Sequence, residues 1–197
     1  MARSEDVRTI TDVRTLAALA HPVRYALLDH LMAAGPATAS QCADALGQSP
    51  SNCSWHLRHL ARFGLVEAAD STDGRERPWH AAATGWHFDA RHAGDAAEAT
   101  TRALAGAGLE QEDRLARTFL SAKPSFAPEW RDAAAFNQYG LRLTASELED
   151  LTAAIDALVR PYIGLTREDV PDDAEPVHVS VRAFPRSRPA AGGANPA

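Results

Sequence analysis

Residues 49–66 constrain the fold more than any other part of this sequence, because they hold both ends of a helix and two contrasting faces. Ser49 can cap the free amides of a first helical turn, and Pro50 already has the φ that the first position requires. Gly64 can end the helix, and an extended run begins directly after it. Apolar residues recur at spacings of three and four, as they do on the buried face of a helix: Cys53, Leu57, Leu60 and Phe63.

The opposite face of this predicted helix is mostly polar and changes in character along its length. Short side chains that form hydrogen bonds come first, and cationic side chains follow. A helix that enters the major groove of DNA needs small polar groups near the base edges and cations near the phosphates. The sequence therefore predicts a DNA-recognition helix with these exposed residues: Ser51, Asn52, Ser54, Trp55, Arg58, His59 and Arg62.

Three shorter helices are predicted before the recognition helix. Residues 1–11 are polar and are expected to be frayed, and residues 12–20 fit a short amphipathic helix. Pro22 interrupts that helix and starts a second one, because the residue before a proline disfavours the α region. Residues 38–46 form a third helix, and a turn at Gly47 joins it to the recognition helix. This order predicts a helix-turn-helix.

A β-hairpin is predicted directly after the recognition helix. Residues 65–69 and 75–82 are two short extended runs on either side of an Asp-Gly turn at Gly74. Arg75 and Arg77 lie close to its tip. A cationic hairpin beside a recognition helix is a wing, which can reach the neighbouring minor groove or its phosphates.

Residues 16–82 together resemble the winged helix-turn-helix of the ArsR-type bacterial repressors. Three motifs carry the resemblance: Leu19-Ala20-His21-Pro22-Val23-Arg24 in the second helix, Ser54-x-His56-Leu57-x-x-Leu60 followed by Gly64-Leu65-Val66, and Gly74-Arg75 at the wing tip. The resemblance covers about a third of the chain. It implies a homodimer that pairs through the first helix and the helix after the wing. It also implies release from an operator when an inducer binds.

The resemblance places this chain in a branch that does not sense metals. Many members bind metals through two thiols in the third helix, and the matching positions here are Thr38 and Ser40, which cannot supply a thiolate to a soft metal. A second family site uses Asp and His after the wing. His87, Asp89 and His92 lie near it, but no matching second pair follows. We therefore expect no metal site and no other cofactor.

Charge and composition restrict how this chain can bind nucleic acid. Its net charge is −6. Residues 1–84 hold 8 Arg and 9 Asp or Glu, a net −1, so the remaining −5 lies after them. DNA binding must then depend on a local cationic face. Cys42 and Cys53 are expected to be reduced core thiols, and the absence of a long apolar run or signal peptide favours a cytoplasmic protein without membrane contact.

The second half is predicted to add a dimerisation helix and a small α+β unit. Residues 85–123 comprise an irregular join, which begins at residue 83, and a long helix. The alternative is that this helix packs only on its own chain. Residues 124–185 hold a helix opened by a capping box at Thr144, between alternating strands at 137–144 and 177–183. Residues 186–197 are predicted to be a disordered tail.

Aromatic residues are more frequent around the join of the two halves than a plain linker needs. They could line a pocket for a small apolar inducer, and the alternative is that they are ordinary core. The candidate pocket residues are Trp79, Trp86, Phe88, Phe119, Trp130 and Tyr139.

The sequence thus predicts a mostly α fold with small β content: a winged helix-turn-helix (12–84), a helical dimerisation segment and a small α+β unit. No phosphate loop, nucleophile elbow or metal-spaced His pair indicates an enzyme. We expect a bacterial, sequence-specific transcriptional regulator, a homodimeric repressor that binds an inverted repeat in double-stranded DNA and responds to a non-metal signal. The alternative is a winged-helix module whose acidic second half binds a protein partner. The predicted DNA contacts are Ser49, Ser51, Asn52, Ser54, Trp55, His56, Arg58, His59, Arg62, Arg75 and Arg77.

Overall fold

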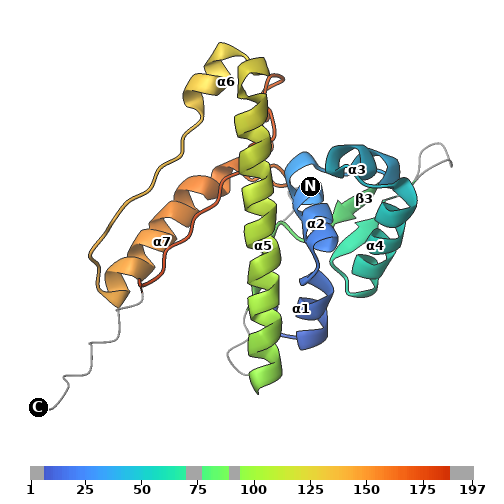
Figure 1. Ribbon diagram of the computed structural model, residues 1–197, viewed down its shortest axis with the longest axis horizontal. Coiled ribbons are helices and arrows are strands. Elements are labelled where there is room, and N and C mark those ends of the chain that lie inside the picture. The colour runs from blue at the N-terminus through green and yellow to red at the C-terminus, as the bar shows by residue number, and fades with distance from the viewer. Residues whose placement is uncertain (1–6, 70–76, 89–93, 187–197) are drawn as a thin grey trace, which may run out of the picture.

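The computed structural model describes residues 7–69, 77–88 and 94–186. It is mostly helical with two small sheets, and its amino-terminal part has the predicted winged helix-turn-helix fold. Figure 1 shows this part on one side of a long helix, α5, and the carboxy-terminal elements on the other side.

Four helices build the amino-terminal part at the positions that the sequence predicted. Side chains just before them satisfy their first amides, which explains where they begin. Asp12 accepts a bond from the Thr15 amide at 3.0 Å, and Thr38 forms a reciprocal capping box with Gln41. The helices are α1 (Val13–Leu19), α2 (Pro22–Ala34), α3 (Ala39–Leu46) and α4 (Pro50–Arg62).

The core lies where these four helices meet the wing. Ten side chains in it are less than 2% exposed, and burial of this much apolar surface is the main force that holds the helices together. Gly47 ends α3 with φ +63°, a left-handed conformation that costs glycine little, and so turns the chain into α4. The ten residues are Leu16, Leu19, Leu27, Leu31, Cys42, Cys53, Leu57, Leu60, Leu65 and Val66.

The wing forms as predicted. Strand β2 (Val66–Ala68) pairs antiparallel with β3 (Trp79–Ala81), with Val66 opposite Ala81. Trp79 also bridges to Ala37, which ties the wing to the segment before α3. The predicted Asp-Gly turn at Gly74 lies outside the described residues.

A second sheet corrects two predictions from the sequence. Strand β1 (Val7–Ile10) pairs in parallel with β4 (Gly85–Phe88), so residues 7–10 are not frayed and the join at 83–94 is not wholly irregular. Ile10 is only 6% exposed and belongs to the core. The pairing joins segments more than seventy residues apart, so no local periodicity indicates it.

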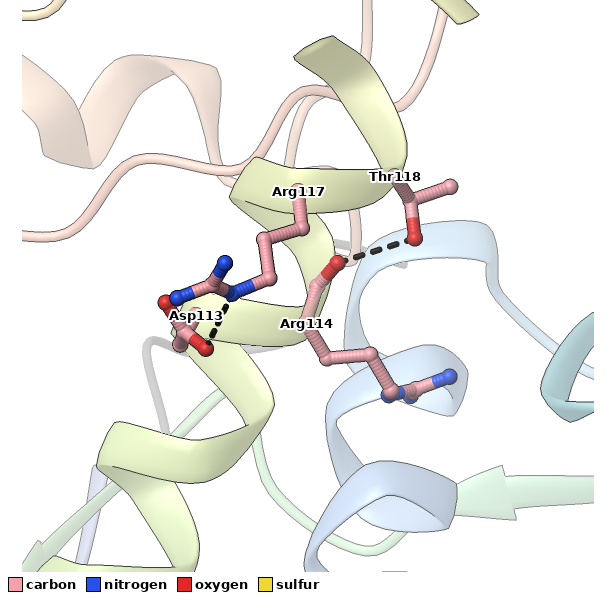
Figure 2. A network of polar contacts seen from close by, with 4 residues as sticks. All are labelled: Asp113, Arg114, Arg117 and Thr118. Atoms are coloured by element: carbon pink, nitrogen blue, oxygen red, sulfur yellow. Dashed lines mark hydrogen bonds and ion pairs between the residues drawn. The ribbon is translucent and has the colours of Figure 1, made fainter. Parts of the chain in front are cut away.

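Helix α5 (Gly94–Ala122) packs along α1 and α2 of its own chain. A Cβ added to Gly108 would lie 3.1 Å from the Tyr25 hydroxyl, so glycine at this position allows the helices to approach closely. Arg114 donates to Gln111, whose amide donates to Asp29 of α2 at 2.9 Å. In Figure 2, Arg114 points toward α2, while Arg117 bonds Asp113 on the other side of the helix. These contacts fix α5 against the DNA-binding part.

The remaining elements are helical or extended, and this differs from the predicted α+β unit. They are η1 (Lys123–Ser125), α6 (Pro128–Ala133), α7 (Ala145–Val159) and η2 (Arg160–Tyr162). The capping box at Thr144 is confirmed, because the Glu147 amide donates to its hydroxyl and the Thr144 amide donates to Glu147. Residues 137–144 and 177–183, predicted to be strands, are extended and exposed but form no sheet among the described residues. None of the described helices is both long and apolar enough to cross a membrane.

Candidate nucleic-acid interface

Helix α4 presents one buried face and one polar face, as its sequence predicted. Cys53, Leu57 and Leu60 have no exposed surface. The opposite side chains of Ser51, Arg58 and Arg62 are exposed, and those of Asn52 and Ser54 are half-buried. The buried face holds the helix rigidly on α3, so the polar face is held in one orientation toward solvent.

Hydrogen bonds within the polar face order its short side chains before any partner arrives. Ser49 Oγ accepts the Asn52 amide at 3.2 Å and lies 3.2 Å from the Ser51 hydroxyl. Asn52 Nδ2 donates to Gln48 Oε1 at 2.9 Å. The sequence analysis did not include Gln48, although its place just before the helix cap could have indicated it. This order reduces the conformational entropy that binding would cost.

A cationic and aromatic row continues the polar face toward the end of α4. Arg58 donates to Ser54 Oγ at 3.0 Å, which holds the guanidinium along the helix. The Trp55 side chain is 54% exposed and stacks on His59, with ring centroids 5.7 Å apart. Trp55 therefore packs on its own helix rather than on the wing. An exposed, ordered aromatic ring offers a flat apolar surface to a sugar or a base methyl.

His56 differs from the other predicted contacts because it is only 5% exposed. Its ring lies 4.8 Å from that of His21, and its Nδ1 has no hydrogen-bond partner among the described residues. Burial, together with the charges of His21, Arg24 and His59, lowers the pKa of His56 from 6.5 to about 4. A neutral buried imidazole cannot neutralise a phosphate, so the prediction of a DNA contact at His56 is wrong and its role is structural.

Burial and nearby cations also lower the pKa of His59, so this ring is neutral near pH 7. Arg58 and Arg62 are therefore the exposed cations that α4 offers. Arg77 is exposed at the base of the wing, and Arg75 lies outside the described residues.

The six aromatic residues of the candidate ligand pocket do not surround one cavity. Trp79 and Trp86 pack against the amino-terminal core. Phe119 contacts Phe126, with ring centroids 5.4 Å apart, near the end of α5. Tyr139 is 74% exposed, Trp130 lies on α6, and the Phe88 side chain lies outside the described residues. A shallow groove between α2, the end of α3 and α5 is lined by none of the six.

The two cysteines are buried and form no disulfide. Burial, with the nearby Cys53 thiol, raises the pKa of Cys42 to about 11. Both thiols are therefore held in the protonated form, as core side chains would be. Among the described residues, no group of three or more His, Cys, Asp or Glu side chains is placed to hold a metal ion.

Comparison with known proteins gives a family match for the amino-terminal part. Residues 19–68 match a family model described as a helix-turn-helix domain. Two solved structures of mutant forms of Lactococcus lactis ZitR are similar at 15% identity: one with 82% of this chain and 81% of that chain covered at a TM-score of 0.28, the other with 81% and 85% covered at 0.29. Likeness at these TM-scores carries no argument about fold or function. No curated protein matches this chain.

Proposed function

We propose that this chain is a sequence-specific, DNA-binding transcriptional regulator that reads the major groove with α4. One observation carries the proposal: α4 follows α3 after a short turn, buries one face completely and presents an ordered polar and cationic row on the other. The helix-turn-helix match over residues 19–68 supports it. Major-groove recognition uses a helix placed in this way.

The exposed residues of α4 and the wing take separate roles in this proposal. Side chains near the start of α4 contact base edges or sugars, and the arginines contact phosphates. Trp55 contacts a sugar or a thymine methyl. His56 takes no part because it is buried. The proposed base and sugar contacts are Ser49, Ser51, Asn52, Ser54 and Trp55, His59 lies deeper along the helix, and the proposed phosphate contacts are Arg58, Arg62, Arg75 and Arg77.

The active form in this proposal is a homodimeric repressor of the ArsR type on an inverted repeat. Helix α5 supports a dimer, because Leu109 and Leu120 are 48% and 56% exposed although other residues of α5 are buried on α1 and α2. Thr38 and Ser40 stand where metal-sensing relatives have thiols, which supports release by a non-metal signal. The signal therefore enters away from α3.

Salt-dependent binding tests the phosphate contacts. Fluorescence anisotropy with duplex DNA, measured between about 50 and 200 mM salt, should show binding for the wild type with a log–log slope that falls by about 0.9 for each arginine removed. Arg58→Ala and Arg62→Ala should each lower the slope. Arg142→Ala removes the same charge from an exposed residue far from α4 and should leave it unchanged. Absence of duplex binding at the lowest salt would contradict the proposal.

A protein-binding module is the second candidate, and the charge of the second half favours it. Residues 124–186 hold 6 Arg and 11 Asp or Glu, a net −5, and all are at least partly exposed. A surface of this charge suits a basic protein partner. A chain that binds no duplex but binds a basic protein in a salt-dependent manner would support this candidate over the regulator.

A further inference from the structure

Residues 134–186, which we call the C-terminal arm, bury none of their side chains within this chain. Figure 1 shows α7 and two extended stretches of the arm standing away from the amino-terminal part. Soluble proteins rarely leave so many large apolar side chains in contact with water. The following arm residues are between 36% and 74% exposed: Phe136, Tyr139, Leu141, Leu143, Leu158, Val159, Tyr162, Val170, Val177, Val179, Val181 and Phe184.

Two stretches of the arm have the pattern of strands but no strand partner. Tyr139, Leu141 and Leu143 alternate with polar residues or glycine, and the three valines of residues 177–181 do the same. Alternation of this kind is typical of a strand with one buried face. No backbone hydrogen bond to residues 135–143 or 175–186 is present among the described residues. Unpaired strands with one apolar face attract further strands.

Contacts with α5 fix which face of residues 177–183 is free. Ser180 donates to Glu112 at 2.8 Å, and Arg182 forms an ion pair with the same carboxylate. Successive side chains of an extended chain point to opposite sides. Because Ser180 and Arg182 face α5, Val177, Val179 and Val181 point away from it, where they are 50–61% exposed. The arm is therefore held in place by its polar face while its apolar face lacks a partner.

The size of the free apolar surface matches half of a dimer interface. With about 200 Å² for each aromatic side chain and about 100 Å² for each aliphatic one, the exposed fractions amount to roughly 1,000 Å² per chain. A stable interface of standard size buries about 800 Å² on each partner. A second copy of this chain would thus cover the arm and be covered by it.

We propose that the C-terminal arms of two copies of this chain pair with each other, with residues 137–144 and 177–183 of each copy contributing strands to one shared sheet. Two strands are marginal alone, whereas three or more with an apolar face are stable, and two copies supply four. Neither stretch contains an acidic residue, so no carboxylate would be buried in the sheet. A twofold arrangement also closes on itself and leaves no surface for further addition. This inference rests on the proposed homodimer and not on DNA binding.

Sedimentation of the full chain over a concentration series tests the proposal with a matched pair of variants. Val179→Glu places a charge on the apolar face, and His178→Glu places the same charge on the neighbouring polar face. Val179→Glu should weaken the dimer at least about tenfold, because the charge would be buried without a partner. His178→Glu should change the dissociation constant less than about twofold. Leu141→Glu gives a second test on the other stretch.

Hydrogen exchange of the arm amides provides a readout that a general loss of folding would not reproduce. Amides of residues 138–143 and 177–183 should be protected in the wild type, and Val179→Glu should remove that protection while the amides of α2 and α4 stay protected. A wild-type monomer at about 50 μM, unprotected arm amides, or Val179→Glu and Leu141→Glu variants that dimerise like the wild type would overturn the proposal.

Duplex binding by the same samples separates this inference from the proposed function. A wild-type dimer with protected arm amides that binds no DNA would contradict the regulator and support arm pairing. A monomer that binds duplex DNA would contradict arm pairing and support the regulator. A monomer whose arm binds a different protein would also overturn the inference, since the free face would then have another partner.

Discussion

His56 makes the folded protein lose stability as the pH falls below about 6.5. Its pKa is about 4 in the folded chain, against 6.5 for an ordinary histidine. Between these values the unfolded chain binds a proton at this site and the folded chain does not, so protonation favours unfolding. The free energy of unfolding should therefore fall by about 1.4 kcal/mol per pH unit in the middle of this window, and by about 3 kcal/mol over its whole width.

Denaturant melts of the wild type, His56→Gln and His178→Gln between about pH 4.5 and 7.5 measure this contribution. His56→Gln should flatten the dependence of the unfolding free energy on pH, whatever its effect on the stability at the upper end of this range. His178 is exposed, so His178→Gln should keep the wild-type slope. The lowered pKa values of His21, His30 and His59 act in the same direction, so a smaller slope remains in the variant.

A wild-type curve and a His56→Gln curve that run parallel from about pH 7 to pH 4.5 would refute this reasoning. They would mean that His56 is protonated in the folded chain as readily as in the unfolded one. The ring would then have a charged-state partner or solvent access that its 5% exposure does not allow.

Two further substitutions test the packing of α4 and the turn before it. Leu57→Ala removes a side chain without exposed surface and should lower the unfolding free energy by about 2–5 kcal/mol, whereas Trp55→Ala on the exposed face should cost less than about 1 kcal/mol in the same melts; similar losses would contradict the assigned faces. Gly47→Ala places a Cβ at φ +63° and should cost about 1 kcal/mol by calorimetry, while no loss would show that the turn relaxes.

Local chemistry made the winged helix-turn-helix predictable from the sequence. Ser49 before Pro50, the capping box at Thr38 and the apolar spacing of α4 each act within one or two helical turns. The structure places each of these elements where the sequence indicated. The face of α4 followed from the same spacing, and only His56 was assigned to the wrong side, because its position at the boundary of the two faces left its burial open.

Long-range pairing explains what the sequence could not predict. Strand β1 exists because residues 85–88 offer it a parallel partner, and nothing in residues 7–10 indicates that partner. The opposite error occurred near Tyr139 and Val179, where the alternation is correct for a strand but the single chain supplies no partner. Alternation records which face will be buried and does not identify the chain that buries it.

Selection of bound fragments from sheared genomic DNA tests the central claim most directly. The purified chain is mixed with fragments at about 150 mM salt, and the bound DNA is sequenced beside the same selection made with Asn52→Ala. The account predicts an enriched inverted repeat with half-sites about one helical turn apart, and altered base preferences for the variant. Bound DNA with the composition of the input, or an identical motif for both proteins, would contradict the claim that α4 reads the sequence.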